Sequence, residues 1–397
     1  MRSSISSSEP AGAAVLESAV SHAPTWPSER PHPAAAPANP DRNKTRGLDR
    51  RVPSMPWLRM LVIGTVSLCV LLTGWEVAMR RLGLRAGDLD DGRAQWAAER
   101  RKVDAGPRDS VVLIGDSRML FDTDLATWQA LTGRKPIQLA LPATNAQAFL
   151  HDLATDEHFT GLAIIGTAET AYFRDGSSYY ASMIDYGKTE TLSQRAGGKI
   201  HAELSRHLAF LDSQYTLFAL VEQNDWPERK GVFSPFQDIW KISETFDDRQ
   251  TVLWDRIERD ATLREHVQGV WKKVFSGEPL AADVIDRAIA GTRADVERIR
   301  ARGGDVAWLR PPSTQPILDS ERRIAPRAKV WDRLLHDTGT IGVHFEDYPQ
   351  MQNLSSPDWS HLSRAGAVTF TDAYVRVLLD RVTWLKSHPV AAAATAQ

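Results

Sequence analysis

An uncharged, apolar run between Met60 and Trp75 restricts the possible folds of this chain more than any other feature. It reads MLVIGTVSLCVLLTGW, and further apolar residues extend it on both sides. A helix needs roughly 20 apolar residues, with about 17 as a lower limit, to cross the hydrocarbon core of a bilayer. The uncharged part is slightly short, but Arg59 can snorkel to the headgroups and tryptophan at either end suits a membrane interface. We therefore predict a transmembrane helix over residues 56–80 that contacts lipid through residues 58–79.

Two alternatives to a transmembrane helix remain. The run also fits a buried core helix or a signal peptide, although a long segment precedes it and no small-x-small cleavage site follows. Positive charges are more numerous before the run than after it: Arg42, Lys44, Arg46, Arg50, Arg51 and Arg59 precede it, and Arg80, Arg81, Arg85 and Arg93 follow. Because Lys and Arg accumulate on the cytoplasmic side of a membrane, we expect a cytoplasmic N-terminus and an extracytoplasmic C-terminal part.

The segments beside this helix do not have the pattern of a packed domain. Residues 1–55 are rich in Ser, Ala and Pro and hold few large apolar side chains, so we expect a disordered cytoplasmic tail. We expect a second disordered tail at residues 387–397. Residues 81–109 are predicted to form a stalk, with a short polar helix at Ala94–Val103.

Composition argues against several classes of function. The formal net charge of −2 gives no support for nucleic-acid binding, which usually needs a basic surface. The single cysteine, Cys69, excludes an intrachain disulfide and a zinc site built on several cysteines. A metal site at His344 and Glu346 would lack the third ligand that zinc needs, so we expect neither a metal nor a cofactor.

From Ser110 onward, short β-branched runs alternate with helical patterns. Strands are expected at Ser110–Ile114, Ile137–Leu141, Leu162–Ile165, Asp305–Leu309 and Val343–Phe345. Helices are expected at Thr123–Thr132, at Asn145–Ala154 with Asn145 as its cap, and at Ala281–Arg302, Arg327–His336 and Ser363–Leu385. This alternation predicts an α/β domain over residues 110–386, with three layers in which helices flank a parallel, flavodoxin-like sheet.

Residues 167–280 interrupt this alternation. They contain several stretches with helical periodicity and many aromatic residues, so we expect a mostly helical insertion. Such an insertion either covers a functional site or adds to the core. The sequence favours neither alternative.

The tripeptide Gly115-Asp116-Ser117 directly follows the first expected strand. Open α/β sheets bind ligands at the carboxyl ends of their strands, so the hydroxyl and the backbone N–H of Ser117 are expected to face that space. The same tripeptide also occurs in ordinary tight turns. Arg310 follows another expected strand, where it would contact either an anionic substrate or a neighbouring acid.

The tetrapeptide Asp358-Trp359-Ser360-His361 lies just before the last expected helix. An Asp and a His three residues apart can meet on a turn, so that the carboxylate accepts the Nδ1 proton and leaves Nε2 as a base for a serine hydroxyl. Alternatively, Asp358 caps a turn and His361 is an ordinary surface histidine. Because the two motifs lie at matching positions of one α/β sheet, we predict a triad of Ser117, Asp358 and His361.

At these residues the chain resembles the SGNH (GDSL) hydrolase superfamily, in particular its membrane-anchored members that act on cell-envelope or exported polysaccharides. The resemblance covers about Ser110–Leu385, apart from the insertion. It implies an SGNH-type fold with Ser117 as the nucleophile and Asp358 and His361 as the other triad members. It also implies an oxyanion hole that includes the N–H of Ser117 and the third sequence block, which begins at Gly166.

The chain departs from the family pattern at two oxyanion donors. The family has a glycine after the second strand, but Leu141–Asn145 (LPATN) contains none, so Ala143 or Thr144 would donate that N–H. The third block reads GTAE from Gly166, with Ala168 in place of the asparagine whose side chain is the last donor. Losing one such donor costs about 100- to 1,000-fold in turnover. The nearest replacements in the sequence are Asn145 and Arg118.

The resemblance implies a serine esterase or O-acyltransferase of the bacterial inner membrane, with its catalytic domain in the periplasm or elsewhere outside the cytoplasm. Its substrate would be a polysaccharide or another ester, the acyl group acetyl, and a membrane-bound O-acyltransferase a possible partner. The missing donors favour a different class, a catalytically weak or inactive accessory protein that binds glycan or such a partner. A lipase or lysophospholipase is a third alternative.

Overall fold

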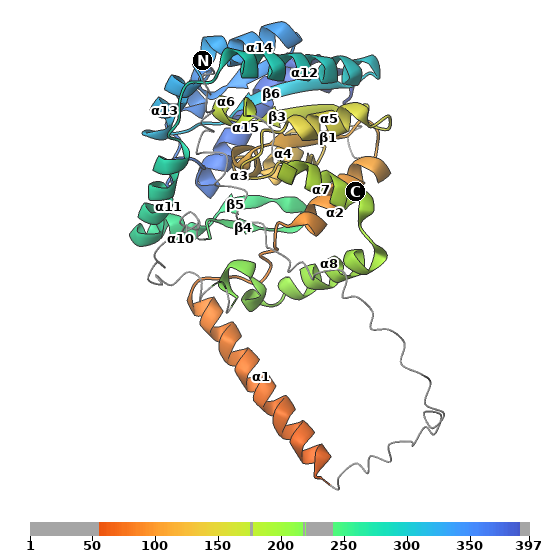
Figure 1. Ribbon diagram of the computed structural model, residues 1–397, viewed down its shortest axis with the longest axis vertical. Helices are drawn as coiled ribbons and strands as arrows, with labels where there is room; N and C mark the ends of the chain where they lie inside the picture. Colours follow the sequence, from red (N-terminus) through yellow and green to blue (C-terminus); the bar gives the residue numbers. More distant parts are fainter. Residues whose placement is uncertain (1–54, 175–177, 217–218, 220–240, 390–397) are drawn as a thin grey trace, which may run out of the picture. The chain divides into compact units, whose positions relative to one another are not determined.

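The structure is a computed structural model that describes residues 55–174, 178–216, 219 and 241–389 (Figure 1). Both predicted tails lie outside these residues, except for residues 55 and 387–389. The chain divides into two compact units, Met1–Ala78 and Met79–Gln397. The described part of the first unit belongs to helix α1 (Trp57–Arg81), whose apolar window is fully exposed. At 25 residues, or about 38 Å, α1 is long and apolar enough to cross a membrane.

The second unit is built on a parallel sheet of five strands. The strands are β1 (Val111–Gly115), β2 (Ile137–Gln138), β3 (Leu162–Gly166), β6 (Asp305–Arg310) and β7 (Ile341–His344). Their order is β2-β1-β3-β6-β7, in which the chain reverses direction across the sheet between β1 and β3. In flavodoxin-like sheets with this order, the ligand binds at that switch point. All five expected strands are confirmed, but β2 has only two residues.

Helices flank the sheet, as predicted. They are α2 (Arg93–Ala105), α3 (Ser117–Phe121), α4 (Leu125–Thr132), α5 (Gln147–Thr155), α12 (Ala282–Ala301), α13 (Ile317–Ile324), α14 (Trp331–Thr338), α15 (Arg364–Arg381) and α16 (Thr383–Ser387). Alternate residues of the strands, such as Ile165 and Trp308, share one apolar cluster with Phe149 of α5, Ile299 of α12 and Leu334 of α14. Elsewhere α4 packs against α15, where the rings of Trp128 and Tyr374 are 5.8 Å apart.

Two helix ends differ from the prediction. Helix α5 begins at Gln147 after Ala146, so Asn145 lies one position too early to be its cap, although its side chain accepts the N–H of Gln147. The expected helix Ser363–Leu385 is divided in two, because Val382 has extended backbone angles between α15 and α16. Ser363 caps α15 through the N–H of Gly366.

The predicted stalk at residues 81–109 is wrong, because this segment packs into the domain. Trp96 of α2 is buried in the main apolar cluster, and its indole N–H donates to the carbonyl of Leu139 at 3.1 Å. Before α2, Leu84 and Leu89 are also buried. Because most residues of the segment are polar, these few apolar residues did not indicate that it packs into the domain.

The insertion is mostly helical, but it also contains strands that the sequence pattern did not predict. Its helices are α6 (Glu169–Tyr172), α7 (Ser178–Thr189), α8 (Leu192–Ser205), α10 (Asp255–Arg259) and α11 (Ala261–Val274), with 3₁₀ turns at Ala209–Leu211, Ser213–Tyr215 and Asp247–Arg249. The antiparallel strands β4 (Ser243–Thr245) and β5 (Thr251–Leu253) form a second sheet. Outside the insertion, further 3₁₀ turns lie at Arg327–Lys329, Phe345–Asp347 and Pro349–Met351. Residues 217–218 and 220–240 of the insertion lie outside the described residues.

Candidate active site

Ser117 is the first residue of α3, two residues beyond the strand β1 at the switch point of the sheet. Two glycines let α3 lie close against the ends of β1 and β3. A Cβ on Gly115, whose φ is +151°, would lie 1.9 Å from the carbonyl oxygen of Gly166. A Cβ on Gly166 would lie 2.2 Å from the sulfur of Met119 in α3. Small residues at both positions therefore set the location of the half-buried Ser117.

Asp116, the middle residue of the Gly-Asp-Ser motif, joins the ends of β1 and β3. Its Oδ1 accepts the N–H of Arg118 at 2.9 Å and caps α3. Its Oδ2 accepts the hydroxyl of Thr167 and the N–H of Ala168, both at 3.0 Å. The carboxylate thus holds the third sequence block next to the serine, a role that the sequence analysis did not assign.

The structure brings Ser117, Asp358 and His361 together. The Nε2 atom of His361 lies 2.9 Å from Oγ of Ser117, and its Nδ1 lies 2.6 Å from Oδ2 of Asp358. The other oxygen of Asp358 accepts the N–H groups of Ser360 at 3.0 Å and His361 at 2.7 Å, which closes the turn. Asp358 and His361 are fully buried, so water does not compete for these hydrogen bonds.

Two neighbouring carboxyl groups have opposite pKa shifts. Burial alone would raise the pKa of Asp358, but the charge and hydrogen bonds of His361 outweigh it and hold the pKa below its ordinary value. Burial raises the pKa of Asp122 well above its ordinary value, against the N–H of Leu362 that its Oδ1 accepts at 2.8 Å. The site therefore favours an ionised Asp358, which keeps the Nδ1 proton on His361, whereas burial disfavours the charged form of Asp122.

Two aromatic side chains enclose the imidazole of His361. The ring of Phe121, from α3, stacks on it with centroids 4.4 Å apart. The ring of Trp271, from α11 of the insertion, meets it edge-on at 5.8 Å. The indole N–H of Trp271 also donates to Oδ2 of Asp358 at 3.1 Å. The sequence analysis missed both residues. Phe121 lies four positions after Ser117, but nothing in the local pattern links it to His361, and Trp271 is far from both motifs in the chain.

One face of α11 contacts the loop that carries Asp358 and His361. Gln268 donates to the carbonyl of Pro357 at 2.8 Å, one turn before the contacts of Trp271. The ammonium group of Lys272 lies 5.2 Å from the centroid of the Trp359 ring. This part of the insertion therefore covers the catalytic loop.

The expected oxyanion donors differ in their availability. The N–H groups of Ser117, Ala143 and Thr144 donate to no acceptor within the described part of the chain. Gly166 lies within the β1–β3 ladder. Its carbonyl accepts the N–H of Asp116 at 3.1 Å, and its lack of a side chain serves the packing of α3.

Both expected replacement donors are engaged elsewhere. The side-chain amide of Asn145 donates to the carbonyl of Arg174 at 2.9 Å. Arg118 is buried, and it donates to Glu321 at 2.6 Å and to Ser360 at 3.4 Å. Its Nη1 has no partner among the described residues, so the two N–H groups of this nitrogen are not used by the fold.

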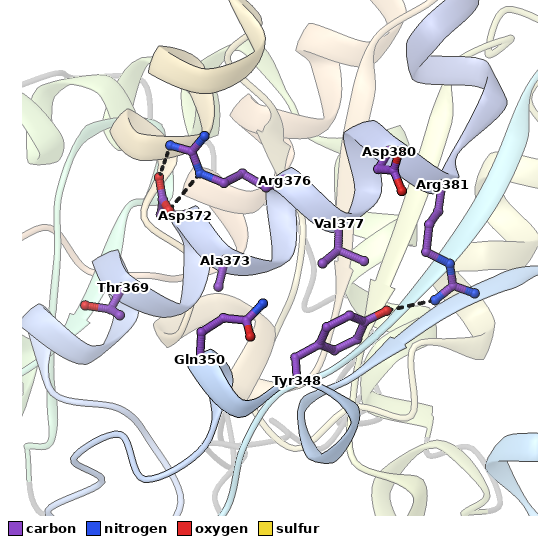
Figure 2. A pocket seen from close by; sticks show the side chains of 9 residues that line it. All are labelled: Tyr348, Gln350, Thr369, Asp372, Ala373, Arg376, Val377, Asp380 and Arg381. Carbon is purple, nitrogen blue, oxygen red and sulfur yellow. Dashed lines mark hydrogen bonds and ion pairs between the residues drawn. The ribbon is translucent and has the colours of Figure 1, made fainter.

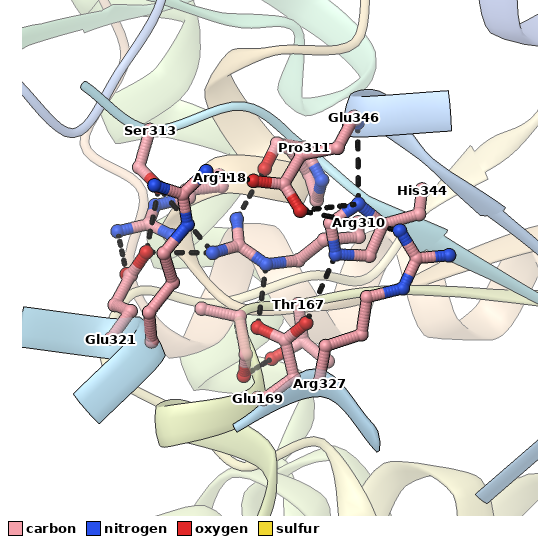
Figure 3. Close-up of polar contacts among 12 residues, drawn as sticks. Arg118, Thr167, Glu169, Arg310, Pro311, Ser313, Glu321, Arg327, His344 and Glu346 are labelled. Atoms are coloured by element: carbon pink, nitrogen blue, oxygen red, sulfur yellow. Dashed lines mark hydrogen bonds and ion pairs between the residues drawn. The ribbon is translucent and has the colours of Figure 1, made fainter. Parts of the chain in front are cut away.

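Arg118 belongs to a buried chain of charges at the carboxyl edge of the sheet (Figure 3). Glu321 also accepts from Arg310 at 2.6 Å, and Arg310 donates to Glu169 at 2.6 Å. Of the two alternatives for Arg310, the structure therefore has the pairing with neighbouring acids. Burial alone would raise the pKa of Glu169, but Arg310 and His344 outweigh it and lower the pKa to about 2.

Both ring nitrogens of His344 have partners. Nε2 lies 3.3 Å from Oε1 of Glu169, and Nδ1 accepts the N–H of Glu346 at 3.2 Å. The ring therefore links two residues of the buried network through hydrogen bonds. It leaves no nitrogen lone pair for a metal.

Two cavities among the described residues lie away from the triad. One, of about 570 Å³, lies along α15 and is drawn in Figure 2; it is lined by Tyr348, Gln350, Thr369, Asp372, Ala373, Arg376, Val377, Asp380 and Arg381. Its arginines are already paired, Arg376 with Asp372 at 2.8 Å and Arg381 with the hydroxyl of Tyr348 at 3.0 Å. The other, of about 320 Å³, lies between α2, α5 and α7. The candidate site is therefore identified by the hydrogen bonds that join Ser117, His361 and Asp358, and not by the size of a cavity.

No protein-family model matches the chain, and no curated protein matches it. The functional assignment therefore depends on the geometry described above.

Proposed function

We propose that the chain is a membrane-anchored serine esterase or O-acyltransferase of the SGNH type. The observation that carries the proposal is the contact of His361 with Ser117 at 2.9 Å and with Asp358 at 2.6 Å. A serine, a histidine and a carboxylate in this order are the arrangement that activates a serine hydroxyl for acyl transfer. The position of Ser117, at the switch point of a parallel sheet, agrees with where such sheets bind ligands.

In the proposed mechanism, Oγ of Ser117 attacks the carbonyl carbon of an ester while Nε2 of His361 takes the hydroxyl proton. The negative charge on the carbonyl oxygen would be stabilised by the N–H of Ser117 and by that of Ala143 or Thr144. The tetrahedral intermediate expels the alcohol, which receives the proton from His361, and an acyl-enzyme remains. Water, in an esterase, or a sugar hydroxyl, in a transferase, then attacks the acyl-enzyme with His361 again as the base.

The proposed location is the inner membrane of a bacterium, with α1 as the anchor and the triad outside the cytoplasm. The proposed substrate is an acetyl ester of a cell-envelope or exported polysaccharide, and a membrane-bound O-acyltransferase is a candidate partner. The length and composition of α1 support the anchor, and the excess of positive charge before it supports the orientation.

Hydrolysis of 4-nitrophenyl esters by the full chain in detergent tests this proposal. The expected result is turnover of the acetyl ester that exceeds turnover of the palmitoyl ester and is lost in Ser117→Ala. Preference for the long chain would instead support a lipase or lysophospholipase. Equal rates in the wild type and in Ser117→Ala would contradict serine catalysis.

A second candidate function is a catalytically weak or inactive accessory protein that binds glycan or a membrane acyltransferase. The observation that favours it is the oxyanion region, where Ala168 replaces the family's asparagine and the side-chain amide of Asn145 donates to Arg174 instead. Since one lost donor costs about 100- to 1,000-fold, the triad can persist with little turnover. Normal acetylation of the glycan in a Ser117→Ala strain would favour this candidate.

A further inference from the structure

Helix α8 carries an apolar stripe that faces away from the domain. Leu192, Ile200 and Leu204 are 82%, 61% and 46% exposed, and Ala196 is exposed as well. These four residues follow one another at intervals of four, so they lie along one side of the helix. Among the described residues that follow α1, the other exposed large apolar side chains are Leu82 and Val368, at 42% and 41%.

The opposite side of α8 is the side that packs on the domain. Arg195, Gly198, Ala202 and Ser205 are the four residues of the helix that are not exposed. A Cβ on Gly198 would lie 3.0 Å from Cβ of Ala94 in α2, so α8 lies close against that helix. A helix on the surface of a soluble domain normally turns its polar side outward, and exposed apolar patches mark interaction sites.

The end of α8 lies beside the point where α1 ends. The guanidinium of Arg80, in the last turn of α1, donates to the carbonyl of His207 at 3.3 Å. The N–H of Gly87 donates to the carbonyl of Ser205 at 2.8 Å. Arg80 and His207 belong to the same compact unit, so the residues that end α1 lie next to those that follow the stripe.

Basic side chains lie beside the stripe, as a surface of anionic lipid would require. On α8 the basic residue is Lys199, which is exposed; Arg206 follows the helix and pairs with Glu203, and Arg80 and Arg81 end α1. Arg195 lies on the side of α8 that packs on the domain and pairs with Glu190. Juxtamembrane Lys and Arg are attracted to anionic headgroups.

We propose that the stripe Leu192–Ala196–Ile200–Leu204 of α8 is inserted in the headgroup region of the bilayer that α1 crosses. This inference rests on the proposed membrane anchor. A helix of this length covers about 21 Å of membrane surface, and interfacial helices bury their apolar face roughly 5–10 Å deep. Together with the packed segment after α1, this contact holds the catalytic domain in one orientation at the membrane.

Spin-label accessibility of the full chain in vesicles of phosphatidylethanolamine and phosphatidylglycerol tests the inference. The native Cys69 reports on α1, while Ile200→Cys and Leu204→Cys, each combined with Cys69→Ser, report on the stripe. Val368→Cys, in the same background, is the matched control, because it is an exposed apolar residue on another helix. Collisions with oxygen, which concentrates in lipid, are compared with collisions with a water-soluble nickel chelate.

The inference predicts that labels at positions 200 and 204 meet oxygen more often, and the nickel chelate less often, than the label at position 368. The same ratio at all three positions would overturn it. Protection of positions 200 and 204 from both reagents would also overturn it, because the stripe would then be covered by protein. A label on Cys69 that meets the nickel chelate freely would refute the anchor itself, whereas a lipid-exposed Cys69 with an aqueous stripe would refute only the contact of α8.

Discussion

Trp271 and His361 donate to the same oxygen of Asp358, the indole at 3.1 Å and the imidazole at 2.6 Å. The indole N–H comes from the insertion, whereas Asp358 and His361 lie on one turn before the last helices. A donor that shares this oxygen reduces the negative charge that the imidazole meets. We therefore expect Trp271 to position Asp358 and to limit the negative charge that this carboxylate presents to His361.

Replacing Trp271 with phenylalanine removes the indole N–H and keeps an aromatic ring. Asp358 then stabilises the imidazolium of His361 more strongly, so we expect the acidic limb of the kcat/KM profile to move to higher pH. A hydrogen bond to a charged group contributes about 1.5–3 kcal/mol. Only a part of this energy changes the interaction of Asp358 with the imidazole, so we expect the acidic limb to move by roughly half a pH unit to one pH unit.

Trp384→Phe is the control for this substitution. Trp384 is also buried, but its indole N–H has no acceptor among the described residues. Its replacement is expected to leave the pH profile unchanged. Equal shifts in both variants, or a loss of rate in Trp271→Phe without any shift, would assign Trp271 to packing alone.

Asp116→Ala is expected to destabilise the domain as well as to lower activity. The substitution leaves the N–H of Ala168 and the hydroxyl of Thr167 without their acceptor and removes the cap of α3. We expect a loss of about 3 kcal/mol in the free energy of unfolding, measured with urea. Asp124→Ala, which removes the cap of α4, is the control and is expected to cost about 1 kcal/mol. Equal losses in the two variants would contradict a joining role for Asp116.

Glu169 is expected to make the stability of the domain depend on pH below about 4.5. Burial would raise its pKa, but Arg310 and His344 lower it from 4.5 to about 2, so the folded state holds the ionised form more tightly than the unfolded state. This contribution is complete above pH 4.5 and is lost as the pH falls towards 2.

Glu169→Gln is therefore expected to show a smaller loss of unfolding free energy between pH 5 and pH 3 than the wild type. Glu297→Gln is the control, because Glu297 pairs with Arg293 on the surface and such pairs contribute little. If the unfolding free energy of Glu169→Gln fell with pH as steeply as that of the wild type, Glu169 would not be the group that makes folding depend on proton binding.

Local sequence patterns predicted the sheet well, because its strands are short apolar runs that end at glycine or in charged loops. They also predicted the three triad residues, since Ser117 follows β1 directly and His361 precedes α15 by three positions. The failures have physical causes. The strands β4 and β5 have three residues each, too few for a periodic signal, and the segment before α2 has only scattered apolar anchors.

Contacts between distant parts of the chain could not be read from local patterns. Trp271 meets Asp358 across 87 positions, and Arg118 meets Glu321 across 203. The sequence left open whether Arg310 contacts an anionic substrate or a neighbouring acid. Only the positions of Glu169 and Glu321 beside it show that it pairs with acids. Gly166 was expected to serve the oxyanion hole, whereas the space that it leaves is filled by Met119.

The most direct test of the central claim is labelling of the full chain with a fluorophosphonate, followed by mass mapping of the modified residue. Such a probe reacts with a serine only when a neighbouring base activates it. The account predicts one phosphonylated residue, Ser117, with labelling lost in His361→Ala and retained in the control His336→Ala, whose imidazole is exposed on α14. A folded wild-type chain that takes no label, or that takes it equally in His361→Ala, would contradict the account.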